Sequence, residues 1–189
     1  MARFIAILAI AIASSAAAQN LPPYPVQSGS MSPTVEAGEQ VAIEVVDFER
    51  LRWGDLVIYW GDSGSGRQLA YIKRVVGLPG QRIAFRDGVL FVDGVPVEQT
   101  ATEIRNVDGR SWQLFTESFG GRHYVIQQLV ESPPASPRTM TEITVPPGHF
   151  FAVGDSRDNS RDSRTLGPIR ATSLLARAVS IETSPDADR

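Results

Sequence analysis

The sequence contains no cysteine, which excludes disulfide bonds, thiolate metal ligands and a cysteine nucleophile. It has only two histidines, His123 and His149, and their spacing matches no metal-binding pattern. We therefore expect neither a metal nor any other cofactor. Basic runs are also missing and the formal net charge is −3, which argues against nucleic acid as a partner.

Lysine is almost absent too: of 18 basic residues, one is Lys73 and the other 17 are arginines. Lys73 lies in the apolar, β-branched stretch 69–77 instead of on a polar surface. Arginine cannot lose its proton at accessible pH, whereas a desolvated lysine can do so and serve as a base. Lys73 is therefore either an ordinary strand lysine paired with a carboxylate or a catalytic amine.

The N-terminus has the three parts of a secretory leader: a short basic start, the apolar stretch 4–13 and the small residues 14–18. The 15 residues 4–18 are fewer than the roughly 20 needed to span a bilayer. This favours a cleaved signal peptide over a short membrane anchor for residues 1–18, although the sequence does not decide between them. In either case we expect the remaining chain to be exported.

From residue 39 onward, apolar stretches separated by turn signals are typical of antiparallel β-structure. Pro79-Gly80 fits the centre of a type II turn, and Asp87-Gly88 and Asp93-Gly94 are strong hairpin signals. The expected strands are 41–46, 55–60, 69–77, 82–86, 89–92, 95–97, 124–130, 143–145 and 149–153, and residues 174–181 are expected to be a short closing element.

Residues 98–141 are more polar and less regular, and 124–130 is the one strand expected there. We interpret this region as an insertion with a small sheet of its own. The predicted organisation is a first part of the core at 19–97, an inserted lobe at 98–142, a second part of the core at 143–181 and a C-terminal tail at 182–189.

Two polar stretches, 27–34 and 154–167, stand out between the strands. The first is either an ordinary loop or a loop that presents a serine hydroxyl and backbone N–H groups to a carbonyl. The second is dense in Asp, Arg and Ser directly after a buried strand, which favours an ordered hydrogen-bonded network over a solvated loop.

A serine nucleophile needs a neighbouring base. His149 begins a predicted strand and His123 lies in the insertion, so we expect both to be structural. The other base able to work near neutral pH is Lys73, and Ser with Lys is an accepted nucleophile–base pair. Ser30 and Lys73 are 43 residues apart, a separation that allows them to meet on neighbouring strands.

Four blocks of the chain resemble those of the bacterial type I signal peptidases, membrane-linked serine proteases that remove leader peptides after export. They are Ser28-Gly-Ser-Met-Ser-Pro-Thr34, Gly54-Asp-Leu-Val-Ile58, Tyr71-Ile-Lys-Arg-Val-Val-Gly-Leu-Pro-Gly80 and Gly154-Asp-Ser-Arg-Asp-Asn-Ser-Arg-Asp-Ser-Arg164. The resemblance runs from residue 28 to residue 167. It departs from the family pattern at Glu39, Gln81 and Ser156, where Asp, Asp and Asn are usual, and in its short N-terminal apolar stretch.

The resemblance implies a role for seven side chains. Ser30 would be the nucleophile and neutral Lys73 the base. The Ser28 hydroxyl and the Ser30 backbone N–H would form the oxyanion hole, and Ser160 would orient the lysine amine. Asp155, Asp162 and Arg164 would support the site structurally. The implied fold is mostly β, with an antiparallel, barrel-like catalytic core and an inserted smaller β lobe, as in the signal peptidases and the self-cleaving SOS repressor proteases.

The implied function is a serine endopeptidase that cuts exported preproteins after small residues, as in A-x-A, through an acyl-enzyme. Its partners would be preprotein signal peptides and a membrane surface. It would act at the outer, periplasmic face of the cytoplasmic membrane, or in the soluble periplasm if the leader is cleaved. The chain's own residues 16–18 are Ala-Ala-Ala, which suggests self-processing.

Two other functions stay open at this point: a specialised maturation peptidase, for example for pilus subunits, and a catalytically silent β-domain that binds exported peptides. A self-cleaving repressor is disfavoured by the leader and by the lack of a DNA-binding segment. The sequence does not indicate the oligomeric state, which preproteins are cut or what the insertion contacts.

Overall fold

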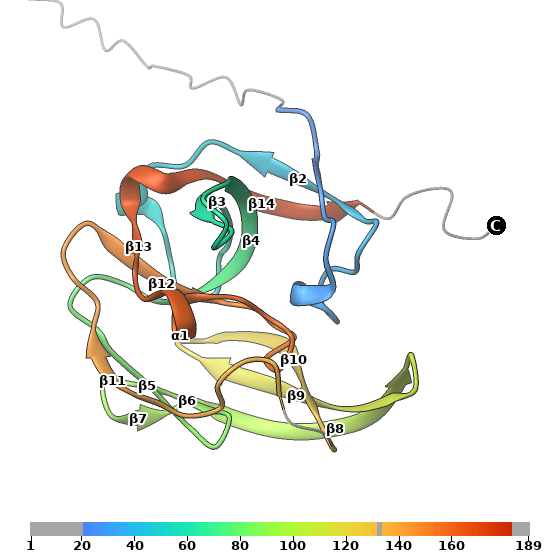
Figure 1. The fold of residues 1–189 in the computed structure, drawn as a ribbon. Helices are drawn as coiled ribbons and strands as arrows, with labels where there is room; N and C mark the ends of the chain where they lie inside the picture. Colours follow the sequence, from blue (N-terminus) through green and yellow to red (C-terminus); the bar gives the residue numbers. More distant parts are fainter. Residues whose placement is uncertain (1–20, 132–133, 183–189) are drawn as a thin grey trace, which may run out of the picture.

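The computed structural model describes residues 21–131 and 134–182, and within them the chain forms three antiparallel sheets (Figure 1). The predicted mostly β fold is therefore confirmed. The predicted leader or anchor at 1–18, and residues 183–189 of the predicted tail, lie outside the described residues.

The largest sheet has seven strands in the order β1-β2-β14-β3-β4-β12-β13. Their bounds are β1 Tyr24–Pro25, β2 Gln40–Glu44, β3 Leu56–Asp62, β4 Gln68–Gly77, β12 His149–Val153, β13 Ile169–Arg170 and β14 Leu174–Glu182. The last strand in sequence, β14, pairs with both β2 and β3 and so lies inside the sheet. The sequence alone had indicated only a short closing element there.

A second sheet, in the order β11-β5-β6-β7, contains the predicted meander. Its strands are β5 Arg82–Arg86, β6 Val89–Val92, β7 Val95–Pro96 and β11 Met140–Thr144. Asp87 and Asp93 have φ values of 50° and 52°, and the glycines after them also have positive φ. These are the left-handed conformations that two-residue hairpin turns require, so both predicted hairpins are confirmed.

The third sheet consists of β8 Glu98–Val107, β9 Arg110–Phe119 and β10 Arg122–Leu129, with β9 in the middle. Only β10 matches a strand expected from the sequence. The turn between β8 and β9 is Asp108-Gly109, with φ values of 50° and 72°, so it repeats the hairpin signal found earlier in the chain. β8 is largely exposed, which explains why it lacks the apolar alternation of a half-buried strand.

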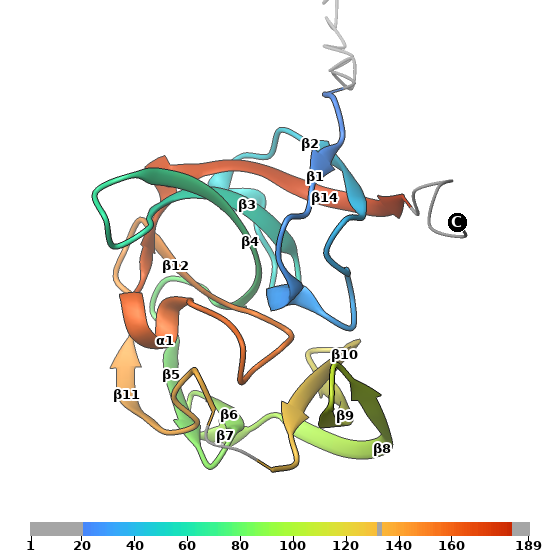
Figure 2. The same cartoon turned by 45° about the vertical axis from the view of Figure 1, so that its right-hand side comes forward.

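Figures 1 and 2 show the second and third sheets on the same side of the seven-stranded sheet, next to each other but separate. The sheet formed by residues 98–129 agrees with an insertion that has its own strands. β11, however, crosses the predicted lobe boundary at residue 142 and pairs with β5 instead. The division into core and lobe stays a prediction.

Successive side chains of β4 point to opposite faces of the sheet, as the packing of the core shows. Tyr71 and Val75 pack in one apolar cluster, together with Phe150 of β12. Ile72 and Val76 face the other way, into two further clusters. Lys73 therefore points to the same side as Tyr71 and Val75.

Short helices complete the described chain: α1 Ser163–Leu166 and the 3-10 turns η1 Gly29–Met31, η2 Phe48–Arg50 and η3 Ala171–Ser173. Among the described residues, no helix has the length and apolar character required to cross a bilayer.

Candidate active site

The structure brings the predicted nucleophile and base into direct contact. Ser30 lies in η1, and Lys73 lies in the middle of β4. Lys73 Nζ is 2.7 Å from Ser30 Oγ. Both residues are buried, with 7% of Ser30 and 2% of Lys73 exposed. At this distance a neutral amine can accept the hydroxyl proton directly.

Burial lowers the pKa of the Lys73 amine from 10.5 to about 8. The carboxylates of Asp162 and Asp155 act in the opposite direction and favour the charged amine, while Arg164 disfavours it. Burial is the largest of these effects. A pKa of about 8 leaves roughly a tenth of the lysine neutral at pH 7, compared with a few molecules in 10,000 at the ordinary value.

A second hydrogen bond holds the lysine amine in place. Nζ donates to the backbone carbonyl of Ile72 at 2.8 Å. The amine is thereby held between this carbonyl and the Ser30 hydroxyl, at the end of a side chain that would otherwise move freely.

Ser28, the predicted oxyanion-hole residue, lies next to Ser30. Its Oγ is 3.2 Å from Ser30 Oγ, and its side chain is exposed. A hydroxyl this close to the attacking oxygen can turn to donate a hydrogen bond to a charge that develops beside it. The oxyanion role stays a prediction.

Ser160 lies beside the dyad but does not form the hydrogen bond to Lys73 that the resemblance implied. It is buried, and its Oγ has no hydrogen-bond partner within the described residues. A Cβ built on Gly154 would lie 2.3 Å from Ser160 Oγ and 2.4 Å from the Ser30 carbonyl oxygen. Only a glycine therefore fits between these two residues, and the orienting role of Ser160 stays a prediction.

Asp155 connects three segments of the site. Its two oxygens accept hydrogen bonds from Arg74 Nε at 2.7 Å and from Arg74 Nη2 at 2.6 Å. Thr34, just after the nucleophile, donates to the same carboxylate at 2.6 Å. Because Arg74 follows Lys73 on β4, one strand presents the base on one face and this ion pair on the other.

Residues 154–164 form a loop that we call the catalytic loop. Asp162 and Arg164 stabilise it through contacts at its two ends. Asp162 is the N-cap of α1, and its carboxylate accepts from Arg164 Nε at 3.0 Å and from the Gly154 N–H at 3.0 Å. Burial raises the pKa of Asp162, but its polar surroundings, Arg164 first among them and then Gly154 and Ser160, outweigh burial and hold it below its ordinary value. The pair therefore joins the two ends of the loop.

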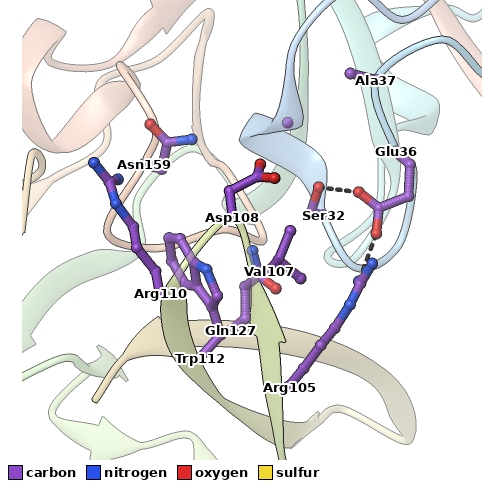
Figure 3. Close-up of a pocket in the computed structure, with 11 residues that line it drawn as sticks. Ser32, Glu36, Ala37, Arg105, Val107, Asp108, Arg110, Trp112, Gln127 and Asn159 are labelled. Carbon is purple, nitrogen blue, oxygen red and sulfur yellow. Dashed lines mark hydrogen bonds and ion pairs between the residues drawn. The ribbon is translucent and has the colours of Figure 1, made fainter. Parts of the chain in front are cut away.

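A polar cavity of about 490 Å³ opens beside the nucleophile, between residues 29–37 and the β8–β9 hairpin (Figure 3). Gly29 and Ser32 line it on one side, and Trp112 lines it on the other. Glu36 spans the two sides: it accepts from Ser32 Oγ and, at 2.6 Å, from Arg105 Nη1 (Figure 3). The sequence does not indicate these residues, because Glu36 and Arg105 are 69 positions apart and belong to no local motif.

The two histidines have local partners, as expected for structural residues. His123 Nδ1 is 2.8 Å from Ser118 Oγ, and His149 Nδ1 is 2.9 Å from the Pro147 carbonyl oxygen.

Comparisons with known proteins identify signal peptidases as relatives. The family described as "Signal peptidase, peptidase S26" matches residues 1–182. Signal peptidase IB of Staphylococcus aureus (strain COL) is 27% identical over 157 residues, which cover 82% of this chain and 74% of the relative. Signal peptidase I of Pseudomonas fluorescens is 32% identical over 160 residues, which cover 75% of this chain and 54% of the relative.

A solved structure of a signal peptidase I from Enterococcus faecalis V583 is 26% identical, with a TM-score of 0.40, and the match covers 69% of this chain and 97% of that one. The family match extends over nearly the whole chain and includes all four blocks, so the resemblance found in the sequence is confirmed. The chain belongs to the signal peptidase family, peptidase S26.

Proposed function

We propose that this protein is a serine endopeptidase that removes N-terminal leader peptides from exported preproteins with Ser30 as nucleophile and Lys73 as base. The observation that carries the proposal is the 2.7 Å contact between Lys73 Nζ and Ser30 Oγ inside a buried environment. Such an environment keeps part of the lysine neutral, and only the neutral amine can accept a proton.

The chemistry proceeds in two steps. In the first, Lys73 takes the Ser30 proton while Oγ attacks the scissile carbonyl, and the Ser30 N–H and Ser28 hydroxyl stabilise the oxyanion. The peptide bond then breaks, the departing amine takes the proton from Lys73, and an ester joins Ser30 to the leader. In the second step Lys73 deprotonates a water molecule, which hydrolyses this ester and releases Ser30.

An open strand edge supports an extended peptide substrate. β4 pairs with β3 along residues 68–74, whereas β12 joins its other edge only from Arg74 onward. Within the described residues, no strand pairs with the second edge of 68–73, although Tyr24 and Lys73 donate side-chain hydrogen bonds to the Ala70 and Ile72 carbonyls, so an added strand next to the dyad would replace these bonds. Met31 and Ile72, the chain neighbours of Ser30 and Lys73, pack with Val26 in one buried apolar cluster beneath this edge.

We place this activity at the outer face of the cytoplasmic membrane, on preproteins that emerge from it. The support is family membership and the leader-like start of the chain. N-terminal sequencing of the mature protein would show whether residues 1–18 are removed, and a Ser30→Ala protein would show whether the removal is autocatalytic.

The direct test is cleavage of a synthetic peptide in which a leader sequence ending in Ala-x-Ala is followed by several further residues, with mass spectrometry of the products. We expect one cut after the second alanine, and no cut with Ser30→Ala. An acylating serine-protease inhibitor should add its mass to Ser30 in the wild type and not in Ser30→Ala. Cleavage by Ser30→Ala would exclude the proposed nucleophile. Acylation of Ser30 without cleavage of any leader peptide would favour the narrower maturation peptidase.

The pH dependence should report the neutral lysine. Because burial lowers the pKa of Lys73 to about 8, kcat/KM should rise nearly tenfold per pH unit below 8 and level off above it. The measurement is kcat/KM on the leader peptide between pH 5 and 10, with the folded fraction followed at each pH. A profile that is flat between pH 6 and 9 would contradict the assignment of Lys73 as base.

A further inference from the structure

A buried ion pair connects the catalytic loop to the third sheet. Arg157 of the loop and Glu117 of β9 have 1% and 0% of their side chains exposed. Arg157 Nη1 donates to Glu117 Oε1 at 2.6 Å, and Nη2 donates to Oε2. Gln99 on β8 also donates to Glu117 Oε1, at 2.8 Å. Two parallel hydrogen bonds of this kind fix both the position and the orientation of the guanidinium group.

From Arg157 the contacts continue to the nucleophile. Arg157 Nε donates to the Gly154 carbonyl oxygen at 3.2 Å, and the Ser156 N–H donates to the Ser30 carbonyl oxygen at 3.2 Å. The Gly154 backbone lies so close to Ser30 that no side chain fits between them. The segment 154–156 therefore sets the position of the Ser30 backbone. Arg157 fixes that segment through its hydrogen bond to the Gly154 carbonyl oxygen.

β10 also holds the loop, mainly through its backbone, and the Gln127 side chain adds a hydrogen bond from Nε2 to Ser156 Oγ at 3.0 Å. The Gln127 N–H donates to the Asp155 carbonyl oxygen, and the Arg157 N–H donates to the Gln127 carbonyl oxygen, each at 3.0 Å. Backbone bonds of this kind need no particular side chain. Glu117 differs because its charge is required: if it were removed, Arg157 would be a buried cation without its partner.

We propose that Glu117, through Arg157, is a positioning residue for the Ser30–Lys73 dyad, and that the β8–β10 sheet thereby helps to set the catalytic geometry. The inference rests on the proposed function, because it concerns the same nucleophile. Glu117 lies outside all four sequence blocks that resemble the family, in the region whose role the sequence left open. Its effect should appear in the chemical step, since a displacement of the nucleophile by about 1 Å can lower a rate on the order of a hundredfold.

The test compares Glu117→Gln and Arg157→Lys with the wild type on the leader peptide. Glu103→Gln is the matched control, because Glu103 is an exposed glutamate on β8 of the same sheet. We expect kcat per folded molecule to fall roughly 10- to 100-fold in both test variants, with KM within about twofold of the wild-type value. The rate of Ser30 acylation by the inhibitor should fall in parallel, and Glu103→Gln should match the wild type.

A double variant, Glu117→Leu with Arg157→Met, separates positioning from stability. Replacing both charges with apolar groups of similar size often restores the stability lost in the single variants. We expect the double variant to fold and still to have a reduced kcat. A wild-type kcat in the folded double variant, or single variants that lose only thermal stability, would overturn the inference. These outcomes leave cleavage by the wild type intact, whereas a wild type that cleaves no leader peptide would refute the proposed function itself.

Discussion

Replacing Lys73 with methionine should abolish leader-peptide cleavage and at the same time raise the free energy of unfolding. Methionine fills nearly the same space but has no group that can accept the Ser30 proton. We expect kcat/KM to fall by at least roughly 10⁴-fold, as is typical when a member of a nucleophile–base pair is removed.

The gain in stability follows from the direction of the pKa shift. The Lys73 pKa is about 8 in the folded protein, against 10.5 for an ordinary lysine. Between these values the unfolded chain binds more protons, so stability rises as the pH increases from 8 to 10.5. Below pH 8 Lys73 is protonated in both states. The folded state then bears the full free-energy cost of burying the charged amine, which is about 3 kcal/mol. Methionine removes this penalty.

Chemical denaturation at pH 7 and pH 10.5 measures this effect. The advantage of Lys73→Met over the wild type should be about 2–3 kcal/mol at pH 7 and should shrink at the higher pH. Lys73→Arg is the companion variant: it keeps the charge, cannot become neutral, and should also be inactive while folded. Cleavage by either variant would remove Lys73 from the mechanism. A stability difference that does not depend on pH would show that its pKa is not lowered by burial.

Replacing Asp155 with asparagine should lower the free energy of unfolding by about 3–5 kcal/mol, the effect typical of breaking a buried ion pair. The side chains of Asp155 and Arg74 are 0% and 6% exposed, so asparagine would leave the Arg74 guanidinium buried without a countercharge. Activity should fall as well, because Asp155 also binds Thr34 just after the nucleophile.

The control for this prediction is the exposed pair between Arg82 and Asp93. Both side chains are about half exposed, and Arg82 Nε is 3.9 Å from Asp93 Oδ1. Asp93 Oδ1 also accepts from the Arg82 N–H at 2.8 Å, a bond that asparagine can keep. Exposed pairs of this kind contribute about 0–1 kcal/mol, so Asp93→Asn should change stability little through this contact. Urea denaturation of the two variants provides the comparison. Similar losses in both would show that burial of the Arg74–Asp155 pair does not decide its importance.

Lys73 was recognisable as a candidate base because its signal is local and compositional. A single lysine in an apolar strand, in a chain that otherwise uses arginine, marks one amine as different from all other basic groups. The hairpins at Asp87-Gly88 and Asp93-Gly94 were predictable for a related reason, since left-handed backbone conformations favour specific residues. The same argument applied to Asp108-Gly109 would have found the β8–β9 hairpin.

The ion pairs that hold the loops could not be predicted in the same way. Glu117 is 40 residues from Arg157, and Glu36 is 69 residues from Arg105, so nothing in the local sequence identifies the partners. For Ser160 the family resemblance implied a hydrogen bond to the lysine amine, whereas in the structure that amine forms hydrogen bonds with Ser30 and Ile72. Such details depend on side-chain positions that the sequence pattern does not specify.

By itself the sequence determined which residues can carry the chemistry, because without cysteine and with its histidines outside the polar loops it left one side-chain amine able to act as a base near neutral pH. Only the tertiary structure decided that this amine is buried deeply enough to have a pKa of about 8 and that it contacts the Ser30 hydroxyl. The physical reason is that burial and ion pairing arise where distant segments pack together, and no single segment contains that information.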